Sequence, residues 1–174
     1  MKPVTVFNHV HDIHQMMLYI IKVLHQLNDK SPQSCCLMAT DQQKGNMLFA
    51  VSVDASGHMD HKRSGKCFYG AQRNTEAILN NAQSEQVLSS GLVAEKGDLV
   101  SKGAIGNGEI IISVYSLGEN GDEASSFYIH KSLFTGPGTF EQSNLHRYFL
   151  DVIKENNPLT EKLLTSKALQ VLNV

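Results

Sequence analysis

The chain of 174 residues is 41% hydrophobic and 18% charged, a composition typical of one globular domain that buries a core without disulfides or metals. Its formal net charge is −2 and its basic residues are scattered, which excludes the basic surface needed to bind nucleic acid or an anionic membrane. The longest apolar run, Met16 to Leu24, contains Lys22 and is too short to cross a bilayer.

The cysteines and the N-terminus bear on the cellular compartment. Cys35, Cys36 and Cys67 are odd in number, and adjacent cysteines rarely bridge each other, so a secreted disulfide framework is not expected. Residues 1–4 begin no apolar signal-peptide segment. We therefore expect a cytoplasmic protein, or one exported by a route without a cleaved signal peptide.

The first predicted element is a helix. Apolar residues recur with a helical period between Ile13 and Leu27, as on a helix with one buried face. Asn8 or Asp12 could cap its start, and residues 28–32 (Asn-Asp-Lys-Ser-Pro) end it.

A β-hairpin is expected next. Ser34–Thr40 and Met47–Asp54 are predicted strands, joined by a turn at residues 41–46. We expect Met59–Arg63 to fold back as a further short strand. A second helical pattern follows from about Tyr69.

The following segment predicts another hairpin and a helix. Leu99–Ile105 and Glu109–Leu117 are expected to be strands joined at Asn107-Gly108, a dipeptide typical of a turn in which both central residues have φ > 0. Residues 124–134 fit a third helix, although residues 125–130 could instead form a strand.

Two further helices are predicted at the C-terminus, one between Thr139 and Asn156 and one beginning near Pro158. The element order predicts an α/β (α+β) fold in one domain, with a core over residues 9–135 and a helical extension over residues 139–174. We expect one central, mainly antiparallel sheet of about five strands flanked by helices. Its central strands are expected to be those at residues 47–54 and 109–117.

The cysteines permit two interpretations. Buried cysteines usually act as small hydrophobic residues, and no residue close in sequence activates Cys35 or Cys36. The alternative is a nucleophile at Cys35, Cys36 or Cys67, with His130 or His146 as the base.

Two metal chemistries can be tested by spacing. His58-x-x-His61 followed by Cys67 could bind haem or a metal ion, but on an extended strand the two histidines would point to opposite faces. Asn74-Thr-Glu76 resembles the helix of a zinc deaminase, yet asparagine occupies the position of the metal ligand and no later pair of cysteines follows. No metal site is therefore expected.

Three segments resemble the GlcG/HbpS-like family over about residues 10–135. They are Val53–Gly57 after an apolar strand, Gly108–Gly118, and Asp122-Glu-Ala124 at the start of a helix. The resemblance implies a central antiparallel sheet, self-association, and binding of haem or a related ligand. The element order is also similar to that of roadblock-type adaptors and small secretion chaperones, which bind proteins.

These observations favour a non-catalytic binding module for a small, haem-like ligand or a protein partner, with His58, His61 and Cys67 as candidate ligand residues. The alternatives are a cysteine-dependent hydrolase or transferase, such as a secreted effector enzyme, and a diverged deaminase-like domain without zinc. Residues 158–174 are apolar on more than one face, and we expect them to mediate self-association or binding of a protein partner.

Overall fold

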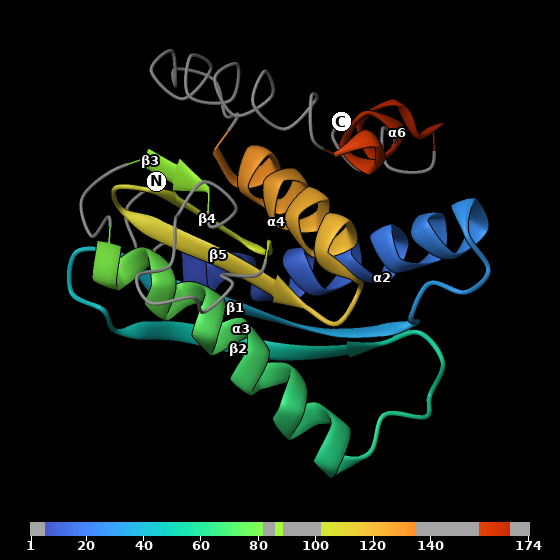
Figure 1. The fold of residues 1–174 in the computed structure, drawn as a ribbon, viewed down its shortest axis with the longest axis horizontal. Coiled ribbons are helices and arrows are strands. Elements are labelled where there is room, and N and C mark those ends of the chain that lie inside the picture. The colour runs from blue at the N-terminus through green and yellow to red at the C-terminus, as the bar shows by residue number, and fades with distance from the viewer. Residues whose placement is uncertain (1–5, 82–85, 89–101, 135–156, 168–174) are drawn as a thin grey trace.

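Five strands form one antiparallel sheet in the order β2-β1-β5-β4-β3. The strands are β1 (Ser34–Asp41), β2 (Met47–Asp54), β3 (Gln86–Leu88), β4 (Ala104–Asn107) and β5 (Ile110–Tyr115). The computed structural model describes residues 6–81, 86–88, 102–134 and 157–167 (Figure 1). The α+β class and the antiparallel sheet predicted from the sequence are confirmed.

Helices cover both faces of this sheet. The helices α2 (Val10–Leu27) and α4 (Glu119–Phe134) pack on one face, and α3 (His61–Asn81) packs on the other (Figure 1). Because successive side chains of a strand point to opposite faces, Cys35 on β1 joins the core shared with α2 and α4. The next residue, Cys36, faces α3, where its Sγ lies 3.7 Å from the carbonyl oxygen of Ser64.

The position of β2 differs from the prediction that it is central. It forms one end of the sheet, whereas β5 lies inside, between β1 and β4. The apolar residues of β2 cover only one face, because Phe49 and Val53 are buried in the core while Ser52 is exposed on the other face. The buried side chains of β5 cover both faces, which is the pattern of an internal strand.

The first helix follows the predicted periodicity, but it starts differently. A short 3-10 turn, η1 (Phe7–His9), precedes α2, and the N-cap is His9, whose side chain makes no capping hydrogen bond. The predicted caps Asn8 and Asp12 are therefore wrong. The helix ends as expected at Asn28, whose N–H donates to the carbonyl oxygen of Leu24 at 3.0 Å.

The strand predicted at Met59–Arg63 is also wrong, because α3 begins at His61. The Asp60 carboxylate accepts a hydrogen bond from the N–H of Arg63 at 2.7 Å, as an N-capping residue does. The loop before it is held by Asp54, which accepts from the N–H of Ser56 at 2.9 Å and of Met59 at 2.7 Å. This cap lies nine residues before the predicted start at Tyr69 and explains the longer helix.

The turn between β4 and β5 differs in backbone conformation from the predicted turn, in which both central residues have positive φ. Among the described residues, Ser116 is the only non-glycine residue with positive φ, so Asn107 does not adopt the left-handed conformation. Its Oδ1 atom instead accepts hydrogen bonds from the N–H groups of Glu109 and Ile110 at 2.9 and 2.8 Å. Gly108 supplies the positive φ, at 88°.

The last two described helices pack against each other. Residues 125–130 are helical within α4, not a strand. The helix α6 (Pro158–Thr165) is capped by Asn157 and packs on α4 and α2, with Leu163 fully buried. The helix predicted between Thr139 and Asn156 and residues 168–174 lie outside the described residues. Within those residues, no helix combines the length and apolar character needed to cross a membrane.

Candidate functional site

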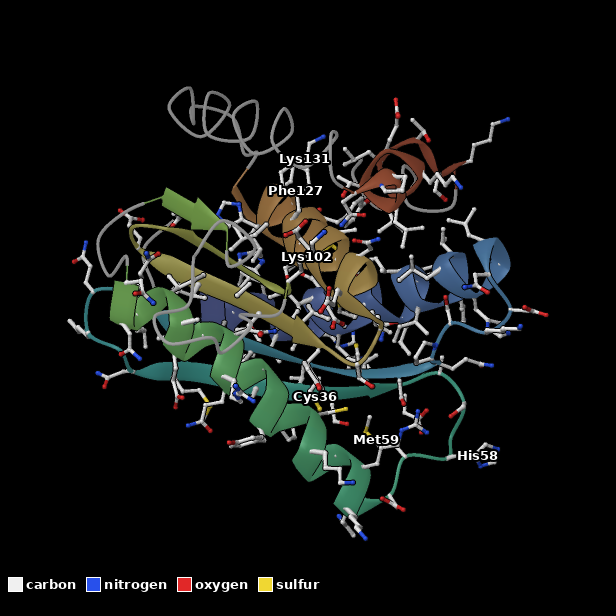
Figure 2. All side chains as sticks on the ribbon, viewed as in Figure 1. Cys36, His58, Met59, Lys102, Phe127 and Lys131 are labelled. Carbon is white, nitrogen blue, oxygen red and sulfur yellow. The ribbon has the colours of Figure 1, made fainter. Side chains whose placement is uncertain are left out.

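The fold brings Cys36 and Cys67 together between the sheet and α3. Cys36 points from β1 towards this helix, and Cys67 lies one helical turn after Ser64, the residue whose carbonyl oxygen Cys36 approaches. The two thiols are hydrogen-bonded to each other. Neither is part of a disulfide, and both are buried, with Cys67 only 3% exposed. Figure 2 shows Cys36 on the sheet face beneath α3. We call these two residues the thiol pair.

The surroundings of the thiol pair shift the pKa values of its two cysteines in opposite directions. The hydrogen bond from Cys36, the hydroxyl of Ser116 and the positive charge of Arg63 together lower the pKa of Cys67 to about 6, against the opposing effect of burial. The same hydrogen bond, together with burial, raises the pKa of Cys36 well above its ordinary value. The Ser116 hydroxyl and the charge of Arg63 therefore favour the thiolate form of Cys67, and a thiolate is the nucleophilic form of cysteine.

Ser116 reaches Cys67 from a strained turn. It follows β5 and has a φ of 102°, a conformation that side-chain-bearing residues rarely adopt. The buried Asp122 stabilises this turn, because its Oδ1 accepts a hydrogen bond from the N–H of Leu117 at 2.7 Å. Strain of this kind persists only when the surrounding structure fixes it, and it is common at functional sites.

The second side of the thiol pair is formed by β2 and the loop that leads into α3. The hydroxyl of Ser52 lies 2.6 Å from Sδ of Met59 and also hydrogen-bonds with Cys36, an interaction that lowers the pKa of that thiol slightly against the larger opposing effects. Figure 2 shows Met59 on the loop near Cys36. The thiol pair thus contacts residues from several elements but has little access to solvent.

The three residues proposed for a haem-like ligand occupy different environments. His58 is exposed at the outer side of the loop (Figure 2), and His61 is exposed at the first position of α3, whereas Cys67 is buried. Among the described residues, no group of three or more histidine, cysteine or acidic side chains could hold a metal ion. Binding of a haem-like ligand remains a prediction.

The nucleophile–base pairs predicted from the sequence meet a geometric obstacle. His130 is fully buried on α4, and α4 packs on the sheet face opposite to the one that carries Cys36 and Cys67. Cys35 does face the α4 side, but burial, together with Asp122 and Cys67, raises its pKa well above the ordinary value. The other candidate base, His146, lies outside the described residues.

The deaminase-like alternative gains no support from the placement of its residues. Asn74 is buried on α3, but Glu76, which would have to transfer protons inside a pocket, is exposed. Its carboxylate accepts a hydrogen bond from Nε2 of Gln72, one turn earlier on the same helix, at 2.7 Å.

A second candidate feature is the outer side of β2. Within the described residues, β1 is the strand that pairs with β2, from Ser34↔Asp54 to Thr40↔Met47, with a shift of register between Ala39 and Thr40, opposite the start of β2. No charged residue and no proline occurs from Met47 to Val53. Met47 is 60% exposed at the start of the strand.

Comparisons with known proteins add a likeness at low similarity. No protein-family model matches this chain, and no curated protein matches it. Among solved structures, the crystal structure of the Ybr137w protein is similar to 69% of this chain and 74% of its own, with 14% sequence identity and a TM-score of 0.40.

Proposed function

We propose that the protein is a non-catalytic binding module that self-associates by pairing strand β2 with the same strand of a second copy. The observation that carries this proposal is the position of β2 at the end of the sheet together with the absence of any charge or proline from Met47 to Val53. Soluble proteins usually protect a long end strand with lysine, proline, a bulge or a covering element, because its free N–H and C=O groups pair with other chains. The pairing of β2 with β1 is irregular only at the start of β2, and from Phe49 to Val53 the strand is regular and carries neither charge nor proline.

The strand is well prepared for such pairing. Phe49 and Val53 anchor it in the core, so its backbone is held in a fixed register before any partner binds. In an antiparallel pair, alternate residues direct their N–H and C=O groups away from the neighbouring strand. Those of β2 therefore point away from β1, towards the position that a further strand would occupy.

A second copy is the occupant that fits this edge. Antiparallel pairing of a strand with its own copy is self-complementary and closes after one contact, which gives a two-fold dimer rather than an open fibre. The strand carries no charge before Asp54, so its copy meets no like-charge repulsion along most of its length.

A binding role is favoured over the hydrolase or transferase alternative by the burial of the thiols. A nucleophile that attacks a large substrate needs access and a nearby base, whereas Cys36 and Cys67 are almost fully buried and the sheet separates them from His130. The C-terminal interface expected over residues 158–174 is not part of the proposal, because the described part of it packs within its own chain.

The test is the mass of the particle in solution under reducing conditions. We expect the natural protein to be a dimer by light scattering after size-exclusion chromatography. The double variant Met47→Lys/Ala50→Lys should be a folded monomer, since both residues lie on β2 and like charges on paired strands repel. Tyr69→Lys is the matched control, because Tyr69 is 64% exposed but lies on α3. A natural protein that is monomeric at all concentrations, or a double variant that stays dimeric, would overturn the proposal.

A further inference from the structure

We propose that Cys36 and Cys67 form a peroxide-reactive dithiol, in which a small hydroperoxide oxidises Cys67 and Cys36 then closes a disulfide between β1 and α3. This site does not depend on the pairing of β2, so each proposal can fail without the other. It gives a use to the thiol pair that the binding role leaves unexplained.

The contact between the two thiols is the first argument. They come from segments far apart in the chain, and the packing of α3 on β1 holds them within hydrogen-bond contact. Cys36 is positioned independently of Cys67, because its Sγ also lies 3.7 Å from the carbonyl oxygen of Ser64. The packing of α3 on β1 thus keeps Cys36 close to the turn of the helix that carries Cys67.

Two neighbours of the thiol pair stabilise a thiolate on Cys67. Arg63 is exposed and supplies a positive charge, and Ser116 directs its hydroxyl to Cys67 from its strained turn. Both stabilise negative charge on Cys67, so Cys67 is the thiol that reacts first. Cys36 is the resolving thiol, since it faces the same turn of α3 and its S–H donates to the carbonyl oxygen of Ser64.

The burial of the pair selects the class of oxidant. With Cys67 at 3% exposure and Cys36 at 0%, a folded protein disulfide cannot reach either sulfur. A small hydroperoxide such as hydrogen peroxide is of the order of a water molecule in size and can enter through local fluctuations of the loop that carries Met59.

The reaction balances without a further reagent. The Cys67 thiolate attacks one oxygen of hydrogen peroxide, the O–O bond breaks, and the departing hydroxide takes up a proton to become water, leaving Cys67 as a sulfenic acid. Cys36 then attacks the sulfur of Cys67, the S–O bond breaks, and the hydroxyl leaves as a second water with the Cys36 proton. Two thiols are oxidised to one disulfide while one peroxide is reduced to two waters.

The test is mass spectrometry of the full chain after exposure to hydrogen peroxide. We expect the intact mass to fall by two hydrogen atoms, and trypsin to release peptides 31–44 and 67–73 joined by a disulfide that dithiothreitol reverses. Because peptide 31–44 contains both Cys35 and Cys36, the matched control is Cys35→Ser, which should form the same cross-link in the same yield.

Two variants separate the roles of the pair. Cys67→Ser should lose the cross-link completely, whereas Cys36→Ser should accumulate a sulfenic acid on Cys67 that dimedone labels. Mapping on the natural protein keeps the test valid if a variant fails to fold. Peroxide treatment that leaves all three cysteines of the natural protein alkylatable, or a cross-link that vanishes in a folded Cys35→Ser variant, would overturn the proposal.

Discussion

Replacing Asp122 by asparagine should remove a pH dependence of stability that the fold creates. Asp122 is 4% exposed in the first turn of α4. Burial raises its pKa from 3.8 to about 8, and the N–H groups of Leu117 and Ser116, which donate to the carboxylate, offset only part of that effect. The carboxyl group of the folded protein is therefore mostly protonated at neutral pH, whereas that of the unfolded chain is ionised.

The sign of the effect follows from proton binding. Between a pKa of 3.8 in the unfolded chain and about 8 in the folded chain, the folded state holds one more proton, so stability decreases as the pH rises. Each pH unit in this interval corresponds to about 1.4 kcal/mol, and the whole interval to roughly 6 kcal/mol. Asparagine does not titrate, and its side-chain oxygen can accept the same hydrogen bond from Leu117.

The assay is urea unfolding of the natural protein and Asp122→Asn at several pH values, under reducing conditions. Replacing the carboxyl group by an amide also changes the free energy of unfolding by an amount that does not depend on pH. The test is therefore the slope of the free energy difference against pH, not its value at one pH. We expect the variant to gain about 1.4 kcal/mol per pH unit relative to the natural protein between about pH 5 and about pH 7. A constant difference across that range would refute the argument that burial keeps Asp122 protonated.

Asp54→Asn is the opposite case and serves as the control. Burial acts to raise the pKa of Asp54, but hydrogen bonds from the Ser56 hydroxyl and from the N–H groups of Met59, Ser56 and Gly57 lower it to about 2. The carboxylate therefore stabilises the fold at neutral pH, and this contribution is lost as the pH falls from 3.8 to about 2. The variant should be less stable at neutral pH and approach the natural protein in acid.

Three further outcomes are expected. The rate at which hydrogen peroxide oxidises Cys67 should rise with a pH midpoint well below that of a free thiol, about 8.5, while Cys35 stays unoxidised in the folded state, and a midpoint at or above that value would contradict the role of its neighbours. Leu163→Ala should lower the free energy of unfolding by about 2–5 kcal/mol, because Leu163 on α6 is fully buried. A loss near zero would mean that α6 is not packed on α4 and α2. Gly70→Ala should destabilise the fold by about 1–3 kcal/mol, because a methyl group there would overlap the Tyr115 ring. Adding Tyr115→Leu to this variant should recover part of the lost stability. Equal stability of Gly70→Ala and the natural protein would contradict this packing.

The thiol pair shows how much of the site the sequence could predict. Alternation along a strand already places Cys35 and Cys36 on opposite faces of the sheet. Cys67 lies four residues before Ala71 and eight before Thr75, so a helix places all three on the same face. Those patterns predict that one adjacent cysteine faces a helix that carries another. They do not predict which one, because the face that α3 covers depends on how the whole sheet is assembled.

The wrong position predicted for β2 and the strand left open as an alternative within α4 have separate physical causes. An apolar strand looks internal when its sequence is read alone, yet β2 is at the end of the sheet, because its neighbour is decided by long-range pairing. Residues 121–130 of α4 are all buried, so their apolar side chains are not confined to one stripe and the helical period is weak. The sequence predicts α2 well because the helix has one buried face, and it predicts the β1–β2 hairpin well because the two strands are neighbours in the chain.

The most direct test of the proposed function is hydrogen exchange of the backbone amides of β2 at low and at high protein concentration. If two copies pair through this strand, amides within Met47–Asp54 that point away from β1 gain partners on dimerisation. The backbone amides of β2 should exchange more slowly as the protein concentration rises, whereas those of α3 should exchange at the same rate. Exchange in β2 that is the same at every concentration would contradict the proposed function.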